Sequence, residues 1–229
     1  MTEKTPPATP VAPNPAAPPV GTQPVGTEKT VVLATRNTGK IAELSALLAG
    51  FGVAVLGLDA FPDIGEIEET GATFAENAAL KARTVAQATG LVALADDSGL
   101  AVDELSGAPG VYSARYAGQG ATDAANNAKL LAALTGVPES RRGCRFISVV
   151  TAHAPNGAEI TAEGRWEGRV LPSPRGTGGF GYDPLFLDPE LGRSAAELAP
   201  AEKNARSHRG HALRALLAHW PAFWAKAQT

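Results

Sequence analysis

Short apolar runs alternate with segments of helical periodicity along most of this chain. The short runs are five or six residues long, and they lie at 31–35, 53–58 and 91–95. This length is typical of buried strands. Between the first two runs, apolar residues recur at the helical spacing of Ile41, Leu44, Leu47 and Leu48. The pattern therefore predicts a strand, a helix and a second strand in succession.

Three further helical faces are expected, from Phe74 to Val85, from Leu130 to Leu134 and from Leu213 to Trp220. Thr73 and Glu76 have the spacing of a capping box at the start of the first of these helices. Thr122 or Asp123 can cap the second helix.

Residues 144–153 and 158–166 are typical of a β-hairpin that turns at Pro155-Asn156-Gly157. A hairpin contributes antiparallel strands, whereas strands joined through helices are usually parallel. The whole pattern thus predicts an α/β fold with a mixed sheet.

The apolar run 91–95 is followed at once by Asp96, Asp97, Ser98 and Gly99. We expect the strand to end here, with two adjacent carboxylates at its C-terminal end. Ligands in α/β sheets bind outside the carboxyl ends of strands, and hard divalent cations prefer carboxylate oxygens. The pair predicts a metal site, while an ordinary Asp-Ser-Gly turn is the alternative interpretation.

A second polar break follows the first strand, at Thr35, Arg36, Asn37, Thr38, Gly39 and Lys40. A strand–loop–helix turn presents backbone N–H groups and the positive end of a helix dipole, where an anion can bind. Lys40 adds a point charge. The segment resembles a phosphate cradle without the glycine and hydroxyl positions of a P-loop. A plain helix start with a solvated lysine is the alternative.

Acidic residues gather before Thr70-Gly71, at Asp63, Glu66, Glu68 and Glu69. One of these glutamates can complete a magnesium shell if it reaches the Asp96-Asp97 pair. The local sequence does not choose among them. A solvated acidic loop near a helix start is the simpler interpretation.

Two later segments carry candidate ligand-binding groups. Within 176–184, four glycines allow a backbone to approach a ligand closely, and Phe180 and Tyr182 offer ring faces to a base. His208 and Arg209 fall in the first turn of the last helix, where the helix dipole disfavours positive charge. Such a placement indicates that the two side chains donate hydrogen bonds to a bound ligand. The alternative is that they are ordinary surface charges.

The composition favours one domain of ordinary size for 229 residues, of which 44% are hydrophobic. A net charge of −3 predicts neither a nucleic-acid nor a membrane partner. Cys144 is the only cysteine, which suits a reducing cytoplasm. Residues 1–29 hold eight of the 18 prolines in a Pro- and Ala-rich stretch. We therefore expect a disordered tail there and a folded domain over 30–229.

Five segments, taken in order, closely resemble the inosine triphosphate pyrophosphatase family. They read ATRNTGKIAEL, EIEETGATFAENAALKA, ADDSGLAVDELSGAPGVYSARYAG, GTGGFGYDPLF and AEKNARSHRGHAL. The resemblance covers roughly residues 31–220. It implies an elongated mixed sheet with flanking helices, in two lobes around a central nucleotide-binding cleft. It also implies Mg²⁺-dependent hydrolysis of dITP, ITP and XTP to the nucleoside monophosphate and pyrophosphate, by a cytoplasmic homodimer with one Mg²⁺ per subunit.

Transferred by position, this resemblance implies roles for individual residues. Asp97 would accept a proton, Glu68 and Asp97 would hold the metal, and Lys40 would act with them on the leaving pyrophosphate. The triphosphate would be contacted by Thr35, Arg36, Asn37, Thr38, Gly39 and Lys40. Ser98 would contact substrate, and the base and sugar-phosphate would be surrounded by Phe180, Gly181, Tyr182, Asp183, Lys203, His208 and Arg209. Arg36 stands where many members carry Gly or His, a difference that we expect to affect phosphate contacts but not the reaction.

Two other functions remain as hypotheses. A Maf-like pyrophosphatase would act on modified pyrimidine or dTTP-type substrates, although the FGYD and SHRG segments argue against it. A nucleotide sensor would bind without catalysis, but it would have no need for Lys40 and a carboxylate pair.

Overall fold

The computed structural model describes residues 29–229. The disordered tail predicted for 1–29 lies outside the described residues except for Lys29, which begins the first strand. The described strands form one seven-stranded sheet in the order β2-β1-β3-β4-β5-β6-β7. Their bounds are β1 Lys29–Leu33, β2 Val53–Gly57, β3 Val92–Val102, β4 Gly143–His153, β5 Glu159–Val170, β6 Phe186–Asp188 and β7 Arg193–Ser194. The sheet is mixed, as predicted, because β2, β1 and β3 run parallel and the remaining neighbours pair antiparallel.

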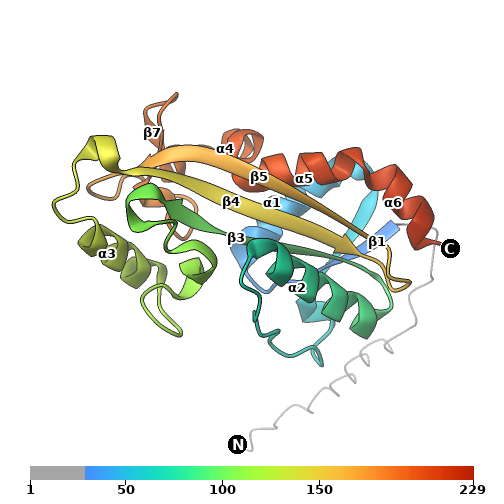
Figure 1. Cartoon of the computed structure of the whole chain (residues 1–229). Coiled ribbons are helices and arrows are strands. Elements are labelled where there is room, and N and C mark those ends of the chain that lie inside the picture. The colour runs from blue at the N-terminus through green and yellow to red at the C-terminus, as the bar shows by residue number, and fades with distance from the viewer. Residues whose placement is uncertain (1–28) are drawn as a thin grey trace, which may run out of the picture.

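The helices of the described chain are α1 Thr38–Leu48, α2 Phe74–Thr89, α3 Asp123–Ala133, α4 Pro200–Arg206, α5 His208–Ala218 and α6 Trp220–Ala227. Figure 1 shows an elongated molecule in which the long β3, β4 and β5 strands run from the α3 end to the α6 end. The two faces of these strands are covered by α5 and α2, which lie on opposite sides in this view. No helix of residues 29–229 is long and apolar enough to cross a membrane.

The caps predicted for α2 and α3 are present, and the structure adds a cap at the start of α1. Thr73 and Glu76 form the capping box of α2, and the Thr122 hydroxyl caps α3 by accepting from the Ala125 N–H. Asn37 caps α1, because its side chain accepts from the Lys40 N–H. Each cap satisfies backbone donors that the first turn of a helix leaves without an intrahelical partner.

The last predicted helix is divided into two. α5 ends at Ala218 and α6 begins at Trp220, with Pro221 in its first turn. Proline lacks a backbone N–H, and its ring clashes with the carbonyl four residues earlier, here that of Leu217, so a single helix cannot continue through this position.

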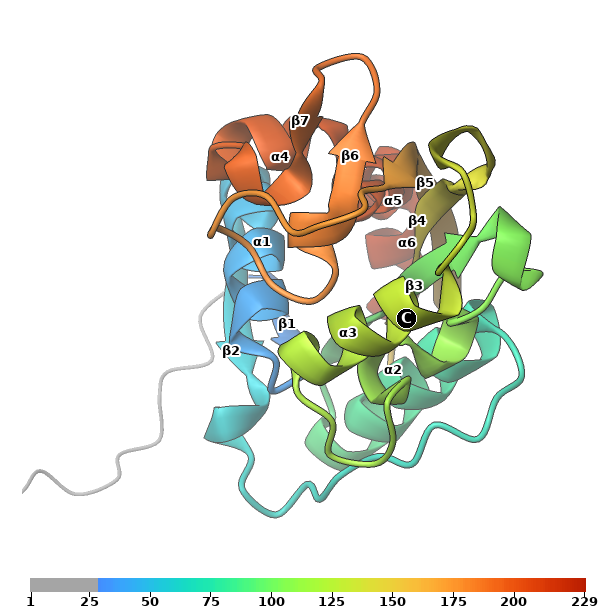
Figure 2. The same ribbon diagram turned by 90° about the vertical axis from the view of Figure 1, so that its left-hand side faces the viewer.

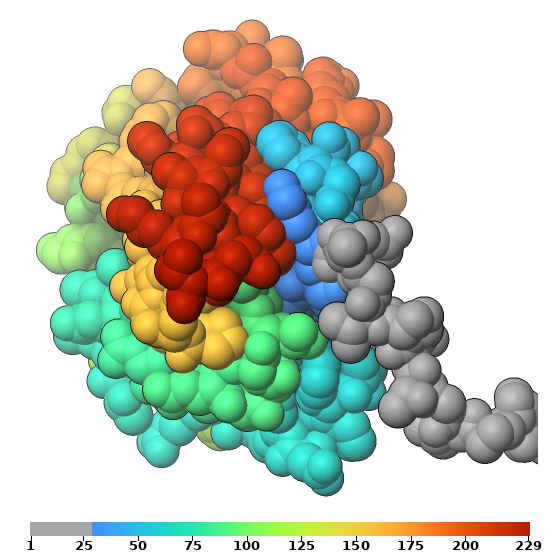
Figure 3. Space-filling model, turned by 90° about the vertical axis from the view of Figure 1, so that its right-hand side faces the viewer, coloured from blue at the N-terminus to red at the C-terminus, as the bar shows by residue number. Residues whose placement is uncertain are grey.

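The predicted hairpin is confirmed by β4 and β5, whose register pairs His153 with Glu159 beside the turn. The turn is also fixed to the end of the chain, because the Asn156 amide donates to the Lys226 carbonyl at 2.7 Å. Figure 3 shows this contact region, with the red α6 lying against the gold hairpin turn.

The expectation that the strand after residue 91 ends at the two aspartates is wrong. β3 continues to Val102, and Asp96 and Asp97 stand in its middle, opposite Val150 and Val149 of β4. β4 pairs with β3 from Ala93 to Val102. These backbone hydrogen bonds keep the Asp-Ser-Gly segment extended, although its sequence favours a turn. On its other side, β3 loses its partner sooner, because β1 pairs with it only as far as Leu94. The acidic residues therefore still lie beyond the carboxyl end of a parallel strand.

Two apolar cores flank the aspartates along β3. The first includes Leu94 with apolar residues of β1, α1, α5 and α6, and the second includes Leu100 with apolar residues of α3, β5 and β6. A smaller third cluster lies between α2 and the β1–β3 pair. The aspartates thus stand on a strand whose two ends are anchored in separate cores.

We predict that Gly164 is needed for the packing of α5 on β5. A Cβ at this position would overlap the backbone of His208 and Ala212. Gly164→Ala should lower the free energy of unfolding by about 1–3 kcal/mol, measured by urea denaturation. Gly50→Ala is the matched control, since a Cβ there meets nothing within 4 Å, and its effect should stay within about 0.5 kcal/mol. Equal effects of the two substitutions would contradict the packing argument.

Candidate active site

The turn between β1 and α1 brings Lys40 inward. Its Nζ lies 2.8 Å from Asp96 Oδ2, and the Lys40 side chain is only 16% exposed. Lys40 also donates to the Asp96 carbonyl at 3.3 Å. The alternative of a solvated lysine at a plain helix start is therefore wrong. A cation and the backbone donors of a helix N-terminus lie together at this turn, which suits a phosphate.

Asp96 is the fixed negative charge of the site. It is buried, and it accepts from Ser148 Oγ at 2.5 Å, from Ser98 Oγ at 3.0 Å and from Arg209 Nη2 at 3.2 Å. Burial opposes its ionisation, but the charges of Arg209 and Lys40 hold the pKa of Asp96 well below its ordinary value. Asp96 is consequently an anchor for donors, because its lowered pKa favours the ionised form that accepts their hydrogen bonds.

Arg209 extends this anchor into a buried chain of alternating charges. Its guanidinium reaches Asp96 on one side and Glu43 of α1 on the other. Glu43 also accepts from Lys203 Nζ at 2.8 Å, and Lys203 lies 2.6 Å from Asp183 Oδ2. The unfavourable first-turn position of Arg209 is thus compensated by two carboxylates from distant parts of the chain. Glu43 was not identified from the sequence.

Asp97 occupies a different environment, although it is the next residue along β3. Neighbouring side chains of a strand point to opposite faces, and Asp97 meets Lys81 of α2 at 3.1 Å. Its other oxygen, Oδ2, is buried and has no hydrogen-bond partner among the described residues. Burial raises the pKa of Asp97 above its ordinary value.

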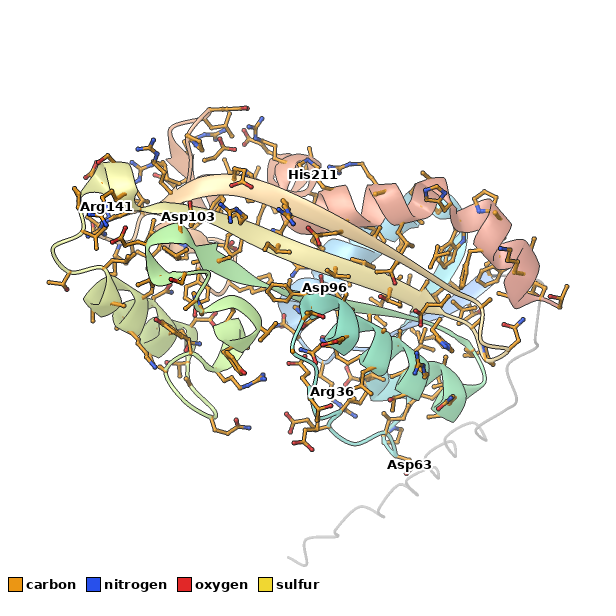
Figure 4. All side chains as sticks on the ribbon, viewed as in Figure 1. Arg36, Asp63, Asp96, Asp103, Arg141 and His211 are labelled. Carbon is orange, nitrogen blue, oxygen red and sulfur yellow. The ribbon has the colours of Figure 1, made fainter. Side chains whose placement is uncertain are left out.

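The second acid beside Asp97 is Glu69, whose Oε1 lies 2.7 Å from Lys81 Nζ. Arg115 holds the other Glu69 oxygen at 3.2 Å. Glu68 is exposed, and unlike Glu69 it does not line the cavity that contains Asp97. The side-chain contacts thus place Glu69 beside Asp97, and the assignment of Glu68 to the metal stays a prediction. Figure 4 shows how far the acidic loop extends, with Asp63 at the outer edge and Asp96 in the middle of the molecule.

Lys81 was missed in the sequence analysis, although a signal for it exists. It lies one residue before Ala82 on the buried face of α2, where a lysine needs a partner. Its Nζ touches Glu69, Asp97 and the Asp96 carbonyl.

Two adjoining cavities contain most of the predicted site residues. The inner cavity, of about 150 Å³, is lined by groups that include Lys40, Glu69, Asp97, Ser98, Phe180, Gly181, Tyr182, Asp183, Lys203, His208 and Arg209. The outer one, of about 580 Å³, is lined by Arg36, Asn37, Thr38 and Gly39 together with Phe180 and Lys203. Phe180 borders both cavities. Figure 2 shows the orange segment after β5, which carries this residue, crossing between α1 and α3.

Three of the predicted residues serve the scaffold in this structure. Thr35 Oγ1 accepts from the Asn37 N–H at 3.1 Å, and Arg36 donates to the Ile64 carbonyl at 2.6 Å, which ties the first loop to the acidic loop. Tyr182 is buried in the second core, and its hydroxyl donates to the Ser113 carbonyl at 2.9 Å. Of the two aromatic residues predicted to contact a base, Phe180 is therefore the one whose ring remains available.

His208 lies on the inner side of the cleft as a neutral imidazole. Its ring stacks on Phe146 with centroids 4.7 Å apart. Burial, reinforced by the charge of Arg209, holds the pKa of His208 well below its ordinary value. His208 Nδ1 has no hydrogen-bond partner among the described residues.

A phosphate-binding turn that faces two carboxylates, with an aromatic ring and buried cations on the other side, defines a cleft for a phosphorylated aromatic ligand. The comparisons agree with this class. Residues 31–219 match the Ham1 family, and the chain belongs to this family.

The relatives cover nearly the whole folded part. A protein of Nitratidesulfovibrio vulgaris named dITP/XTP pyrophosphatase is 62% identical over 201 residues, which are 85% of this chain and 97% of the relative. A protein of the same name from Thioalkalivibrio sulfidiphilus is 56% identical over 189 residues, or 82% and 96% of the two chains. A HAM1 protein from Coxiella burnetii has a TM-score of 0.77 at 47% identity, covering 84% of this chain and 98% of that one.

We predict that His208 makes the fold sensitive to mild acid. The pKa of His208 is lowered in the folded protein. As pH falls below 6.5, the unfolded chain therefore binds a proton at this residue and the folded protein does not, which favours unfolding. Stability should therefore drop between pH 7.5 and 5.5, with up to about 1.4 kcal/mol contributed by this residue. Urea unfolding of the wild type and of His208→Asn at both pH values checks this. An equal pH dependence in the two proteins would contradict it.

Proposed function

We propose that this protein hydrolyses dITP, ITP and XTP to the nucleoside monophosphate and pyrophosphate. The observation that carries the proposal is the position of Asp97 in one cavity with both Lys40 and Arg209. Groups suited to phosphates and groups suited to a base thereby share a single cleft. The names of the relatives support the choice of substrates.

We assign a single Mg²⁺ to the carboxylates of Asp97 and Glu69, and the ion would displace Lys81 or Arg115 from one of the two Glu69 oxygens that they hold in this structure. No group of three or more His, Cys, Asp or Glu residues within 29–229 is arranged to hold an ion. Mg²⁺ instead commonly takes one or two carboxylates together with substrate phosphates. The buried Asp97 Oδ2 without a partner is an oxygen suited to this purpose. When bound, the ion would neutralise charge that develops on the phosphate oxygens.

Residues of this chain would then supply the remaining steps. Lys40 and the N-terminus of α1 bind the phosphates. Asp97 accepts a proton from water while the water oxygen bonds to the α-phosphorus. The bond from the α-phosphorus to the bridging oxygen breaks, and pyrophosphate leaves. The pinned, ionised Asp96 keeps Lys40 in place during this exchange.

Base selection follows from donors at the other end of the cleft. Arg209 Nε is buried and has no hydrogen-bond partner among the described residues. A 6-keto oxygen of hypoxanthine or xanthine can accept from such a donor, whereas the 6-amino group of adenine leaves it unpaired. Mismatches of this kind can give discrimination of about 10⁴-fold. Guanine shares the 6-keto group, so its exclusion has to act at the 2-amino group.

We extend the proposal to a cytoplasmic homodimer with one Mg²⁺ per subunit, as the family resemblance implies. The free and buried Cys144 is compatible with a reducing compartment.

The decisive test is pyrophosphate release, with the monophosphate identified, from dITP, XTP, GTP, ATP and dTTP. With Mg²⁺, dITP and XTP should be hydrolysed up to about 10⁴-fold faster than ATP, and EDTA should abolish release. Asp97→Asn should fold normally and lose nearly all turnover. Release only from dTTP-type substrates would establish the Maf-like alternative, and tight binding without product would establish a sensor.

A paired substitution tests which acid acts with Asp97. Glu69→Gln should lower kcat/KM for dITP by about 100-fold, roughly 2.7 kcal/mol of transition-state stabilisation, and should raise the Mg²⁺ concentration needed for half-maximal rate. Glu68→Gln is the matched control, because this side chain is exposed, and it should remain within about twofold. The reverse order of effects would restore Glu68 to the metal site.

A further inference from the structure

The loop that carries Phe180 has little conformational preference of its own. Gly176, Gly178, Gly179 and Gly181 leave the backbone free to adopt many conformations, which is costly to restrict. The ring of Phe180 nevertheless has a defined place, since a Cβ on Gly39 would lie 2.6 Å from its Cδ1. Asp183 fixes the Phe180 backbone locally, since the Phe180 N–H donates to Asp183 Oδ2 at 2.9 Å and the Phe180 carbonyl accepts from the Asp183 N–H at 3.2 Å. Contacts from outside the loop then set the position of this local turn in the cleft.

One helix face holds Gly181, the residue directly after Phe180. The Gly181 N–H donates to Asp123 Oδ2 at 2.6 Å, and the Asn127 amide donates to the Gly181 carbonyl at 2.9 Å. Asp123 and Asn127 lie four residues apart on α3, so they share one face. Gly181 has a φ of +61°, a conformation that side chains rarely adopt.

The same helix also holds a second part of the wall of the inner cavity. Asn126 is buried, and it accepts from the Ala117 N–H at 2.7 Å and donates to the Ala114 carbonyl at 3.1 Å. Ala114 and Gly181 both line that cavity. The start of α3 therefore connects two walls that are far apart in sequence.

The Asp123 side chain is not required to cap its own helix. Thr122 already performs that role through its bond from the Ala125 N–H at 3.2 Å. The Asp123 carboxylate is directed to the glycine-rich loop, and it borders both cavities.

We propose that Asp123 and Asn127 are positioning residues, which clamp Gly181 and thereby set Phe180 against the base. The inference rests on the proposed function, because Phe180 lies beside the two base-side cations. Lys203 Nζ is 4.9 Å and Arg209 Cζ is 5.6 Å from its ring centroid. Release of Gly181 would let the ring move away from these donors while Asp97 and Lys40 stay in place.

The test compares Asp123→Ala with Asp123→Asn in the full chain. Both variants remove the charge at the helix start, but only Asp123→Asn keeps an oxygen that can accept from the Gly181 N–H. Asp123→Ala should raise KM for dITP about tenfold with kcat within about threefold, and Asp123→Asn should stay close to the wild type. Asn127→Ala should raise KM in the same direction by releasing the carbonyl.

Hydrogen exchange of residues 176–183 without substrate provides the second measurement. Exchange should speed up in Asp123→Ala and Asn127→Ala but not in Asp123→Asn, while the amides of β3 and β4 keep their protection. Unchanged exchange and KM in Asp123→Ala would overturn the clamp. Equal losses in Asp123→Ala and Asp123→Asn would also overturn it, because the charge itself would then matter. If the wild type failed to hydrolyse dITP, the proposed function would fall, and the exchange result alone would decide the clamp.

Discussion

The buried carboxylate of Asp96 is the constraint on which the rest of the site depends. A charge taken out of water is costly unless it is paired, and removing one partner of a buried pair usually costs several kcal/mol. Asp96 obtains its partners from α1 and α5, which supply Lys40 and Arg209. Glu43 and Lys203 then continue the pairing toward Asp183. The phosphate side and the base side of the cleft are therefore parts of one electrostatic unit.

The alternation of a β-strand explains how two neighbouring aspartates acquire different tasks. Asp96 faces cations that keep it ionised, whereas burial raises the pKa of Asp97 and leaves one of its oxygens without a partner. Pairs of titratable groups whose environments push their pKa values apart are characteristic of sites with divided chemical roles. A shift of one residue in the register would exchange the two environments.

The sequence was sufficient for the order of the elements, the helix caps and the segments that meet in the cleft, because periodicity and capping are local properties. It could not predict that β3 runs through the aspartates, since the pairing with β4 involves residues about fifty positions away. Which of Glu68 and Glu69 faces Asp97 depends on the course of a loop without periodicity, and the contact of Glu69 with Lys81 is visible only in three dimensions. Glu43 lies among ordinary helix residues, and its partners come from α4 and α5.

The sequence separation of the ion-paired residues in this charge network also affects how the chain folds. Arg209 meets Asp96 across 113 residues and Glu43 across 166 residues. During synthesis, the amino-terminal half of the sheet therefore emerges from the ribosome long before its compensating cations. Contacts of such sequence separation form late, because loop-closure entropy must be overcome first. A nascent chain that has not reached α5 would carry two carboxylates without their main partner, so the active centre cannot mature before α5 has been synthesised.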